Sequence, residues 1–137
     1  MGTGLFLTVV VGFEIGFGRK TLGISGMSLS CAAIAGLLVS PLLEEVLFRG
    51  LVMNEFARAF SPGSANLLVS ILFAGIHVPY WFYHLGVTQA VLVNLGGVFF
   101  FSLLAGWVYL QARSVWPAIV AHIANNVAAQ LLVAVNR

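Results

Sequence analysis

Two adjacent carboxylates and a nearby arginine are the residues of this sequence that are best placed to do chemistry. Glu44 and Glu45 lie in the middle of an apolar stretch, and Arg49 follows Glu45 by four positions. Residues four apart share a helix face, so Glu45 can pair with Arg49. Glu44 points about 100° away from Glu45 and has no local cation. A desolvated carboxylate without a cationic partner can act as a general base.

Two histidines and an asparagine lie at a similar expected depth in other apolar stretches. His122 and Asn126 are one turn apart on the same helix face, and His77 belongs to a separate stretch. At about 1.5 Å per residue, Glu44 and His77 lie about 21 and 22 Å from the polar ends of their helices. His122 and Asn126 lie about 12 and 18 Å from theirs. The common depth predicts that these side chains form one site.

The chemistry that fits this set is hydrolysis of a carbonyl compound by an activated water molecule. Glu44 would be the base, and a neutral imidazole such as that of His77 could hold the same water by hydrogen bonding. His122 and Asn126 could present polar hydrogens to a developing oxyanion. The serines lack a nucleophile signature such as G-x-S-x-G.

Four other interpretations of these residues stay open at this point. Glu44, His77 and His122 could bind zinc, although no H-E-x-x-H motif occurs. The two histidines could hold a b-type haem, and Glu44 with the histidines could form a proton or ion path. The Glu45–Arg49 pair could serve helix packing alone, but that would not explain the second carboxylate.

The composition indicates which solvent surrounds the protein. The chain has 137 residues, of which 61% are hydrophobic and 7% charged, whereas an ordinary soluble domain has about 25% charged residues. So few charges cannot provide the polar surface of a small soluble protein. The net charge of +2 comes with no basic run, which argues against a nucleic-acid partner. We therefore expect an integral membrane protein whose surroundings are the lipid bilayer.

Five apolar runs separated by short polar segments organise the chain. They cover residues 4–18, 28–58, 62–80, 87–111 and 116–135. Because a helical span needs about 20 residues, the sequence predicts an all-α, polytopic transmembrane helix bundle. We expect about four full spans and one short N-terminal helix, in a single domain over residues 1–137. Pro41 lies inside the second run and predicts a kink one turn before Glu44.

Three short motifs on separate runs also carry a resemblance to a known family. In chain order they are Glu44-Glu45-x-x-x-Arg49, Phe73-x-x-x-His77 and His122-x-x-x-Asn126. This order and placement resemble the signature of the CPBP family of intramembrane proteases. That family includes the type II CAAX prenyl proteases and the bacteriocin-processing, Abi-like proteins. The resemblance covers a motif core over residues 41–126.

The resemblance implies a role for each residue of the motifs. Glu44 would activate the water with assistance from His77, and Phe73 would pack beside His77. His122 and Asn126 would stabilise the oxyanion.

By the same resemblance, Glu45 would pair with Arg49 and hold the helix that carries the base. The implied activity is that of an intramembrane endopeptidase that cleaves a membrane-associated peptide, prenylated CAAX-like peptides included. We expect no cofactor, with zinc on Glu44, His77 and His122 as the alternative. A non-catalytic immunity or scaffold protein of the same fold, or a proton or ion transporter, are the alternative functions. The expected location is the plasma membrane of a prokaryote.

Overall fold

A long helix and three further helices make up most of the part of the chain that the structure describes. The computed structural model describes residues 20–22, 31–85 and 89–134. The short helix predicted over residues 4–18 lies outside these residues, as do residues 28–30, 87–88 and 135 of the later runs. After the long helix come α5 (Pro62–Leu85), α6 (Gln89–Ala112) and α7 (Trp116–Leu131).

The long helix, called helix 31–59 below, consists of alternating α-helical and π-helical segments. In chain order they are α2 (Cys31–Ile34), η1 (Ala35–Val39), α3 (Ser40–Glu45), η2 (Val46–Val52) and α4 (Met53–Ala59). Proline has no N–H to donate to the preceding turn. The wide π-helical turn η1 lies directly before Pro41, and the backbone stays helical through it. Both glutamates therefore lie on α3, between the two π-helical segments.

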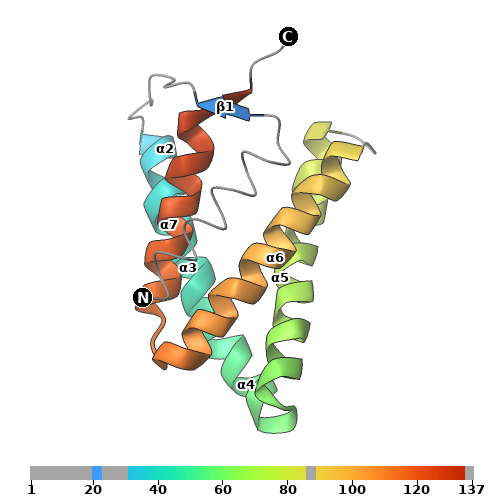
Figure 1. Ribbon diagram of the computed structural model, residues 1–137, viewed down its shortest axis with the longest axis vertical. Coiled ribbons are helices and arrows are strands. Elements are labelled where there is room, and N and C mark those ends of the chain that lie inside the picture. The colour runs from blue at the N-terminus through green and yellow to red at the C-terminus, as the bar shows by residue number, and fades with distance from the viewer. Residues whose placement is uncertain (1–19, 23–30, 86–88, 135–137) are drawn as a thin grey trace.

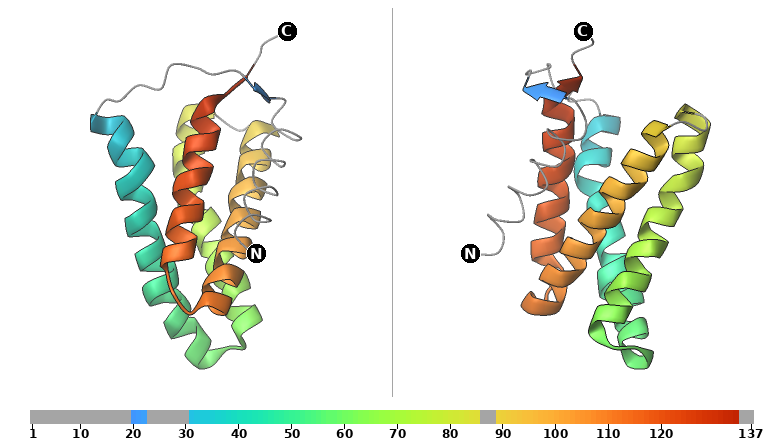
Figure 2. Two further views of the ribbon diagram at one scale, coloured as in Figure 1. Left: turned by 60° about the vertical axis from the view of Figure 1, so that its left-hand side comes forward. Right: turned by 45° about the vertical axis from the view of Figure 1, so that its right-hand side comes forward.

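The four helices are arranged as two neighbouring pairs (Figure 1). Helix 31–59 lies beside α7, and α5 and α6 form an antiparallel hairpin, as a second direction of view also shows (Figure 2). Helix 31–59 and α5 meet at one end of the molecule, and α6 and α7 are joined near the same end. Between these ends, side chains of helix 31–59 are in contact with side chains of both α6 and α7.

Close packing of the α5–α6 hairpin depends on a glycine. Asn66 of α5 donates from Nδ2 to the carbonyl oxygen of Leu103 at 3.0 Å. A Cβ atom on Gly106 would lie 1.9 Å from Oδ1 of Asn66. Glycine at position 106 thus leaves room for the Asn66 side chain, which a larger residue would displace from its hydrogen bond with Leu103.

Two buried apolar clusters hold the helix pairs together. The cluster between helix 31–59 and α5 consists of Phe48, Met53, Ala65, Val69 and Phe73. The cluster between α6 and α7 consists of Phe101, Ala105, Val108, Ala118 and Ala121. Polar side chains fill the space between these clusters, which places the candidate site at the centre of the bundle.

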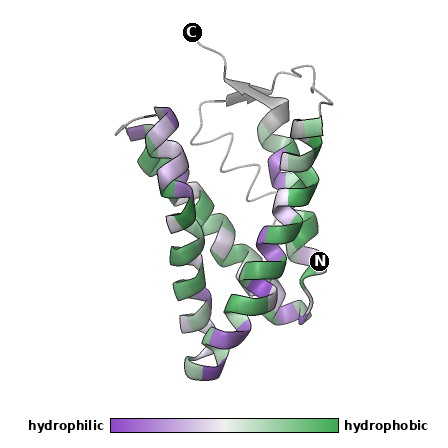
Figure 3. Cartoon of the chain, turned by 180° about the vertical axis from the view of Figure 1, so that it is seen from behind, coloured by the Kyte–Doolittle hydropathy of each residue, from purple (hydrophilic) through white to green (hydrophobic). Residues whose placement is uncertain are grey.

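The outer surface is apolar, as a bilayer requires. Large hydrophobic side chains such as Leu43, Leu92 and Val120 are more than half exposed, and hydrophobic residues dominate the helices in Figure 3. Two helices of the described chain, over Pro62–His84 and Gln89–Ala112, are long and apolar enough to cross a membrane. The helical bundle is thus as predicted, whereas four full spans are not confirmed.

A small sheet adds to the predicted all-α fold. Strand β1 (Lys20–Leu22) pairs antiparallel with β2 (Leu132–Ala134), with Lys20 opposite Ala134. The prediction of one helical run to residue 135 is therefore wrong at its end, because α7 stops at Leu131. The backbone groups of Leu132–Ala134 pair with β1 instead of continuing the helix.

Candidate active site: a buried polar cluster

An ion pair without solvent contact forms the centre of the site. Nη1 of Arg49 lies 3.0 Å from Oε1 of Glu45, and both side chains are 0% exposed. The two residues belong to adjoining segments, α3 and η2. In an apolar interior such a pair is retained only if further hydrogen bonds compensate for the lost hydration.

One such hydrogen bond joins the ion pair to α7. Nδ1 of His122 lies 2.9 Å from Oε1 of Glu45, the same oxygen that pairs with Arg49. Nε2 of this ring lies 3.9 Å from Oε2 of Glu44. His122 therefore lies between the two adjacent glutamates, with a different ring nitrogen towards each.

A second link joins the ion pair to α6. Nη2 of Arg49 donates to the hydroxyl oxygen of Ser102 at 2.8 Å and to the carbonyl oxygen of Ser102 at 2.9 Å. Arg49 thus connects helix 31–59 with α6, and Glu45 connects it with α7. Within the described chain, Oε2 of Glu45 and Nε of Arg49 are buried without a hydrogen-bond partner.

Aromatic rings enclose this cluster. The guanidinium carbon of Arg49 lies 4.7 Å from the ring centre of Phe73, a distance at which a cation is attracted to the ring face. The ring of His122 lies 4.9 Å from that of Phe101 and 6.0 Å from that of Phe73. Both phenylalanines are buried, so they exclude water from the ion pair.

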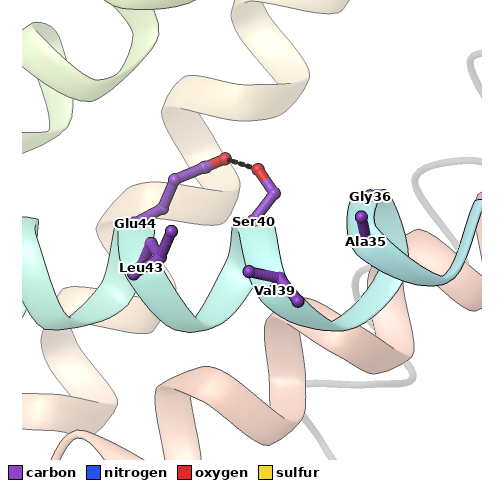
Figure 4. A pocket seen from close by; sticks show the side chains of 6 residues that line it. All are labelled: Ala35, Gly36, Val39, Ser40, Leu43 and Glu44. Atoms are coloured by element: carbon purple, nitrogen blue, oxygen red, sulfur yellow. Dashed lines mark hydrogen bonds between the residues drawn. The ribbon is translucent and has the colours of Figure 1, made fainter. Parts of the chain in front are cut away.

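Glu44 differs from Glu45 because it lies at the edge of the cluster. Its side chain is 24% exposed, and it accepts a 2.5 Å hydrogen bond from Oγ of Ser40, one turn earlier. Figure 4 shows these two side chains turned towards each other beside a pocket of about 350 Å³. The residues that line this pocket are Ala35, Gly36, Val39, Ser40, Leu43 and Glu44. A carboxylate at the wall of an apolar pocket can meet both water and a substrate.

Asn126 lies one helical turn beyond His122, as the spacing requires. Its Nδ2 reaches the carbonyl oxygen of Gly36 at 3.5 Å, and its Oδ1 lies 3.5 Å from Nδ2 of Asn125. Both contacts are long for hydrogen bonds. Since Gly36 also lines the pocket, the carboxamide of Asn126 lies near its wall.

Among the described residues, the contacts of the His77 side chain are with Phe73 and Trp81 of its own helix. Its Nδ1 lies 2.8 Å from the carbonyl oxygen of Phe73, one turn earlier. Its ring lies 5.1 Å from that of Phe73 and 5.5 Å from that of Trp81. The ring of Phe73 therefore lies near both imidazoles, at 5.1 Å from His77 and 6.0 Å from His122.

The zinc alternative would place one metal ion on Glu44, His77 and His122. Among the residues that the structure describes, no three His, Cys, Asp or Glu side chains lie close enough to bind one metal ion. His77 and His122 each engage Nδ1, with the carbonyl oxygen of Phe73 and with Glu45 respectively, and such contacts are compatible with a metal at the other ring nitrogen. Whether the protein uses a metal nevertheless stays a prediction to be tested.

Ser102 and Ser40 contact the site without belonging to any of the three motifs. The contact of Ser40 could have been predicted from the sequence, because Ser40 precedes Glu44 by four positions and so shares its helix face. The sequence indicates less about Ser102, which is a hydroxyl residue in the middle of a Phe-rich apolar run. Its contact with Arg49 joins residues 53 positions apart, which no local spacing reveals.

The three motifs lie within a region of the chain that matches a known protein family. Residues 26–128 match the family model described as Type II CAAX prenyl endopeptidase Rce1-like. The match spans most of the chain and includes all three motifs. The chain belongs to this Rce1-like family. No curated protein and no solved structure matches the chain significantly.

Membership of the Rce1-like family confirms the resemblance on which the motif analysis was based. It supports a membrane-integral hydrolase of the type II CAAX prenyl protease kind. The two long apolar helices of the hairpin agree with a membrane location. A prokaryotic plasma membrane stays a prediction.

Proposed function

We propose that this protein is an intramembrane endopeptidase in which Glu44 activates the attacking water. The observation that carries the proposal is the position of the Glu44 carboxylate. It lines the pocket, it is partly exposed, and its Oε2 lies 3.9 Å from an imidazole nitrogen of His122. A general base must reach water as well as the reacting carbonyl group, and Glu45, which is fully buried, could not.

The proposed reaction follows from these positions. Glu44 takes a proton from water, and the water oxygen attacks the carbonyl carbon of the scissile peptide bond. The resulting oxyanion accepts a hydrogen bond from the carboxamide of Asn126. The C–N bond then breaks, and Glu44 returns the proton to the leaving amine. His77 and His122 are the imidazoles that we place around the attacking water and the substrate.

Glu45 and Arg49 support this chemistry without touching the substrate. Both are fully buried, and their contacts reach α6 and α7. We propose that they hold α3 at a fixed rotation about its axis, because this rotation determines the direction of the Glu44 side chain. Catalytic groups need such support, since small misplacements reduce the rate strongly.

The proposed substrate is a membrane-associated peptide. Apart from Ser40 and Glu44, the pocket is lined by apolar residues and glycine, and the surrounding surface is apolar. A peptide with a lipid anchor or apolar side chains would reach this pocket from the bilayer. The family description makes prenylated CAAX-like peptides the first substrates to test.

The test compares the wild-type protein with Glu44→Gln in detergent or lipid vesicles. Prenylated CAAX peptides, and the same peptides without the prenyl group, are incubated with each protein, and new termini are identified by mass spectrometry. Glu55→Gln is the matched control, because Glu55 is an exposed carboxylate on the same helix. We expect cleavage by the wild type and by Glu55→Gln, and cleavage that is about 10²–10⁴-fold slower by Glu44→Gln.

The outcomes also separate the alternative functions. If no peptide is cleaved, and no cellular peptide changes its termini when Glu44 is replaced, the protein is a non-catalytic immunity or scaffold protein of the same fold. Charge movement across vesicles in the absence of peptide would indicate a proton or ion transporter. Either result would overturn the proposal.

A further inference from the structure

A buried serine ties the ion pair to the helix hairpin. The side chain of Ser102 is 0% exposed in the middle of α6. Its hydroxyl and carbonyl oxygens both accept hydrogen bonds from Nη2 of Arg49. One nitrogen of the guanidinium group is therefore held from α6, while Nη1 is directed at Glu45. A planar guanidinium held at two nitrogens has a fixed orientation.

Arg49 and His122 are linked through Glu45, which contacts both. Oε1 of Glu45 faces Nη1 of Arg49 and Nδ1 of His122 at 3.0 and 2.9 Å. An ionised carboxylate has lone pairs only, so Nδ1 must carry the hydrogen of this bond. In the neutral imidazole the other nitrogen, Nε2, is then left with a lone pair.

This lone pair faces Glu44. Nε2 of His122 and Oε2 of Glu44 are 3.9 Å apart, which is too long for a direct hydrogen bond. A water molecule can bridge two acceptors across such a gap by donating one hydrogen to each. A neutral His122 with this tautomer accepts a hydrogen bond, which differs from the oxyanion role predicted for it.

We propose that Ser102 is a positioning residue that acts through Arg49 and Glu45 on the ring orientation and tautomer of His122. In this arrangement His122 accepts a hydrogen bond at Nε2 from the water that Glu44 deprotonates. The inference rests on the proposed function and extends it by a residue that lies outside the three motifs. It assigns the order Ser102, Arg49, Glu45, His122 from α6 to the water.

The chain offers a matched control for Ser102. Ser70 is also a serine with 0% exposure in an apolar helix of the same hairpin. Its hydroxyl donates to the carbonyl oxygen of Asn66 within α5 at 2.7 Å. Replacing either serine by alanine removes one buried hydroxyl, but only Ser102→Ala removes a contact with Arg49.

The first measurement is the tautomer of His122, read from ¹⁵N shifts of histidine-labelled full-length protein in lipid nanodiscs. The His122 signals are assigned by their loss in His122→Gln. We expect hydrogen on Nδ1 in the wild type and in Ser70→Ala, and a mixture of tautomers in Ser102→Ala. A wild-type pattern in Ser102→Ala would overturn the proposal, and so would equal changes in both serine variants.

The second measurement is kinetic. Partners that orient a metal-bound histidine typically matter by about 10–100-fold, and by analogy kcat of Ser102→Ala should fall by about that factor while KM stays unchanged. Ser70→Ala should keep the wild-type kcat. An unchanged kcat in Ser102→Ala, or a change in KM alone, would contradict the positioning role.

Two further arms keep the test decisive. Ser102→Cys keeps the volume of the side chain but has a weaker acceptor, so it should shift the ¹⁵N signals in the same direction even if Ser102→Ala folds poorly. If the wild type cleaves no peptide, the proposed function fails. The tautomer measurement still decides in that case whether Ser102 positions His122.

Discussion

Helix 31–59 contains two acid–base pairs of similar geometry in opposite surroundings. Glu45 and Arg49 are 3.0 Å apart and fully buried. Glu55 and Arg58 are 3.1 Å apart, with side chains that are 56% and 76% exposed. The buried pair also contacts Ser102 and His122, as described above, whereas the hydrogen bond of the exposed pair joins two residues of one helix turn.

The difference shows that pair geometry alone says little about function. An exposed pair contributes about 0–1 kcal/mol, because water screens it. A buried pair is critical because removal of one partner leaves the other charge buried without compensation. The further hydrogen bonds that such a pair needs also hold the neighbouring side chains in place. The following predictions test this contrast, beginning with the carboxylate that the buried pair positions.

Replacing Glu44 by glutamine should have the largest effect on turnover. Because the base is lost while the ion pair beside it remains, kcat should fall by about 10²–10⁴-fold. The melting temperature in detergent should stay close to that of the wild type. A loss of folding comparable to that of Glu45→Gln would contradict the division of roles between the two glutamates.

Replacing Glu45 by glutamine should have the largest effect on stability. The change leaves Arg49 charged and buried without its partner, which typically costs about 3–5 kcal/mol. The free energy of unfolding is measured by denaturant titration in mixed micelles. A variant as stable as the wild type would mean that the buried pair is no more critical than the exposed one.

Replacing Asn126 by alanine tests the side of the site that lies away from the ion pair. Loss of one oxyanion donor typically lowers kcat by about 10²–10³-fold. KM and the melting temperature should change little, since Asn126 makes only long contacts in the structure. A variant that mainly raises KM would assign Asn126 to substrate binding instead.

Replacing Glu55 by glutamine should have a small effect on stability. The exposed pair loses its attraction, but both side chains remain hydrated, so the free energy of unfolding should fall by about 0–1 kcal/mol. The same titration as for Glu45→Gln gives the comparison directly. A cost equal to that of the buried pair would remove the basis of the contrast.

Removal of metal should have the smallest effect. We expect full activity after treatment with a strong chelator, because a carboxylate base with neutral donors can hydrolyse the peptide without zinc. Bound metal is quantified in the same samples by mass spectrometry. Activity that is lost on stripping and restored by stoichiometric zinc would overturn the glutamate mechanism and favour Glu44, His77 and His122 as ligands.

Local patterns in the sequence were sufficient for part of this description. The low content of charge determined that the helices face an apolar solvent, because such a chain cannot cover itself with polar groups. The spacing of Glu45 and Arg49 determined that they could pair, since a helix places residues four apart on one face. The order of the three motifs determined the family, which the match over residues 26–128 confirms.

Only the tertiary structure decided which groups meet across helices. Glu45 and His122 are 77 positions apart, and their contact depends on how α3 and α7 are rotated about their axes. Depth along a helix, which was the basis for grouping His77 with Glu44, does not specify that rotation. The contacts of His77 are with Phe73 and Trp81 of its own helix. The rotation of α3 depends on contacts made elsewhere along helix 31–59: Phe48 packs into the cluster with α5, and Arg49 reaches Ser102 on α6.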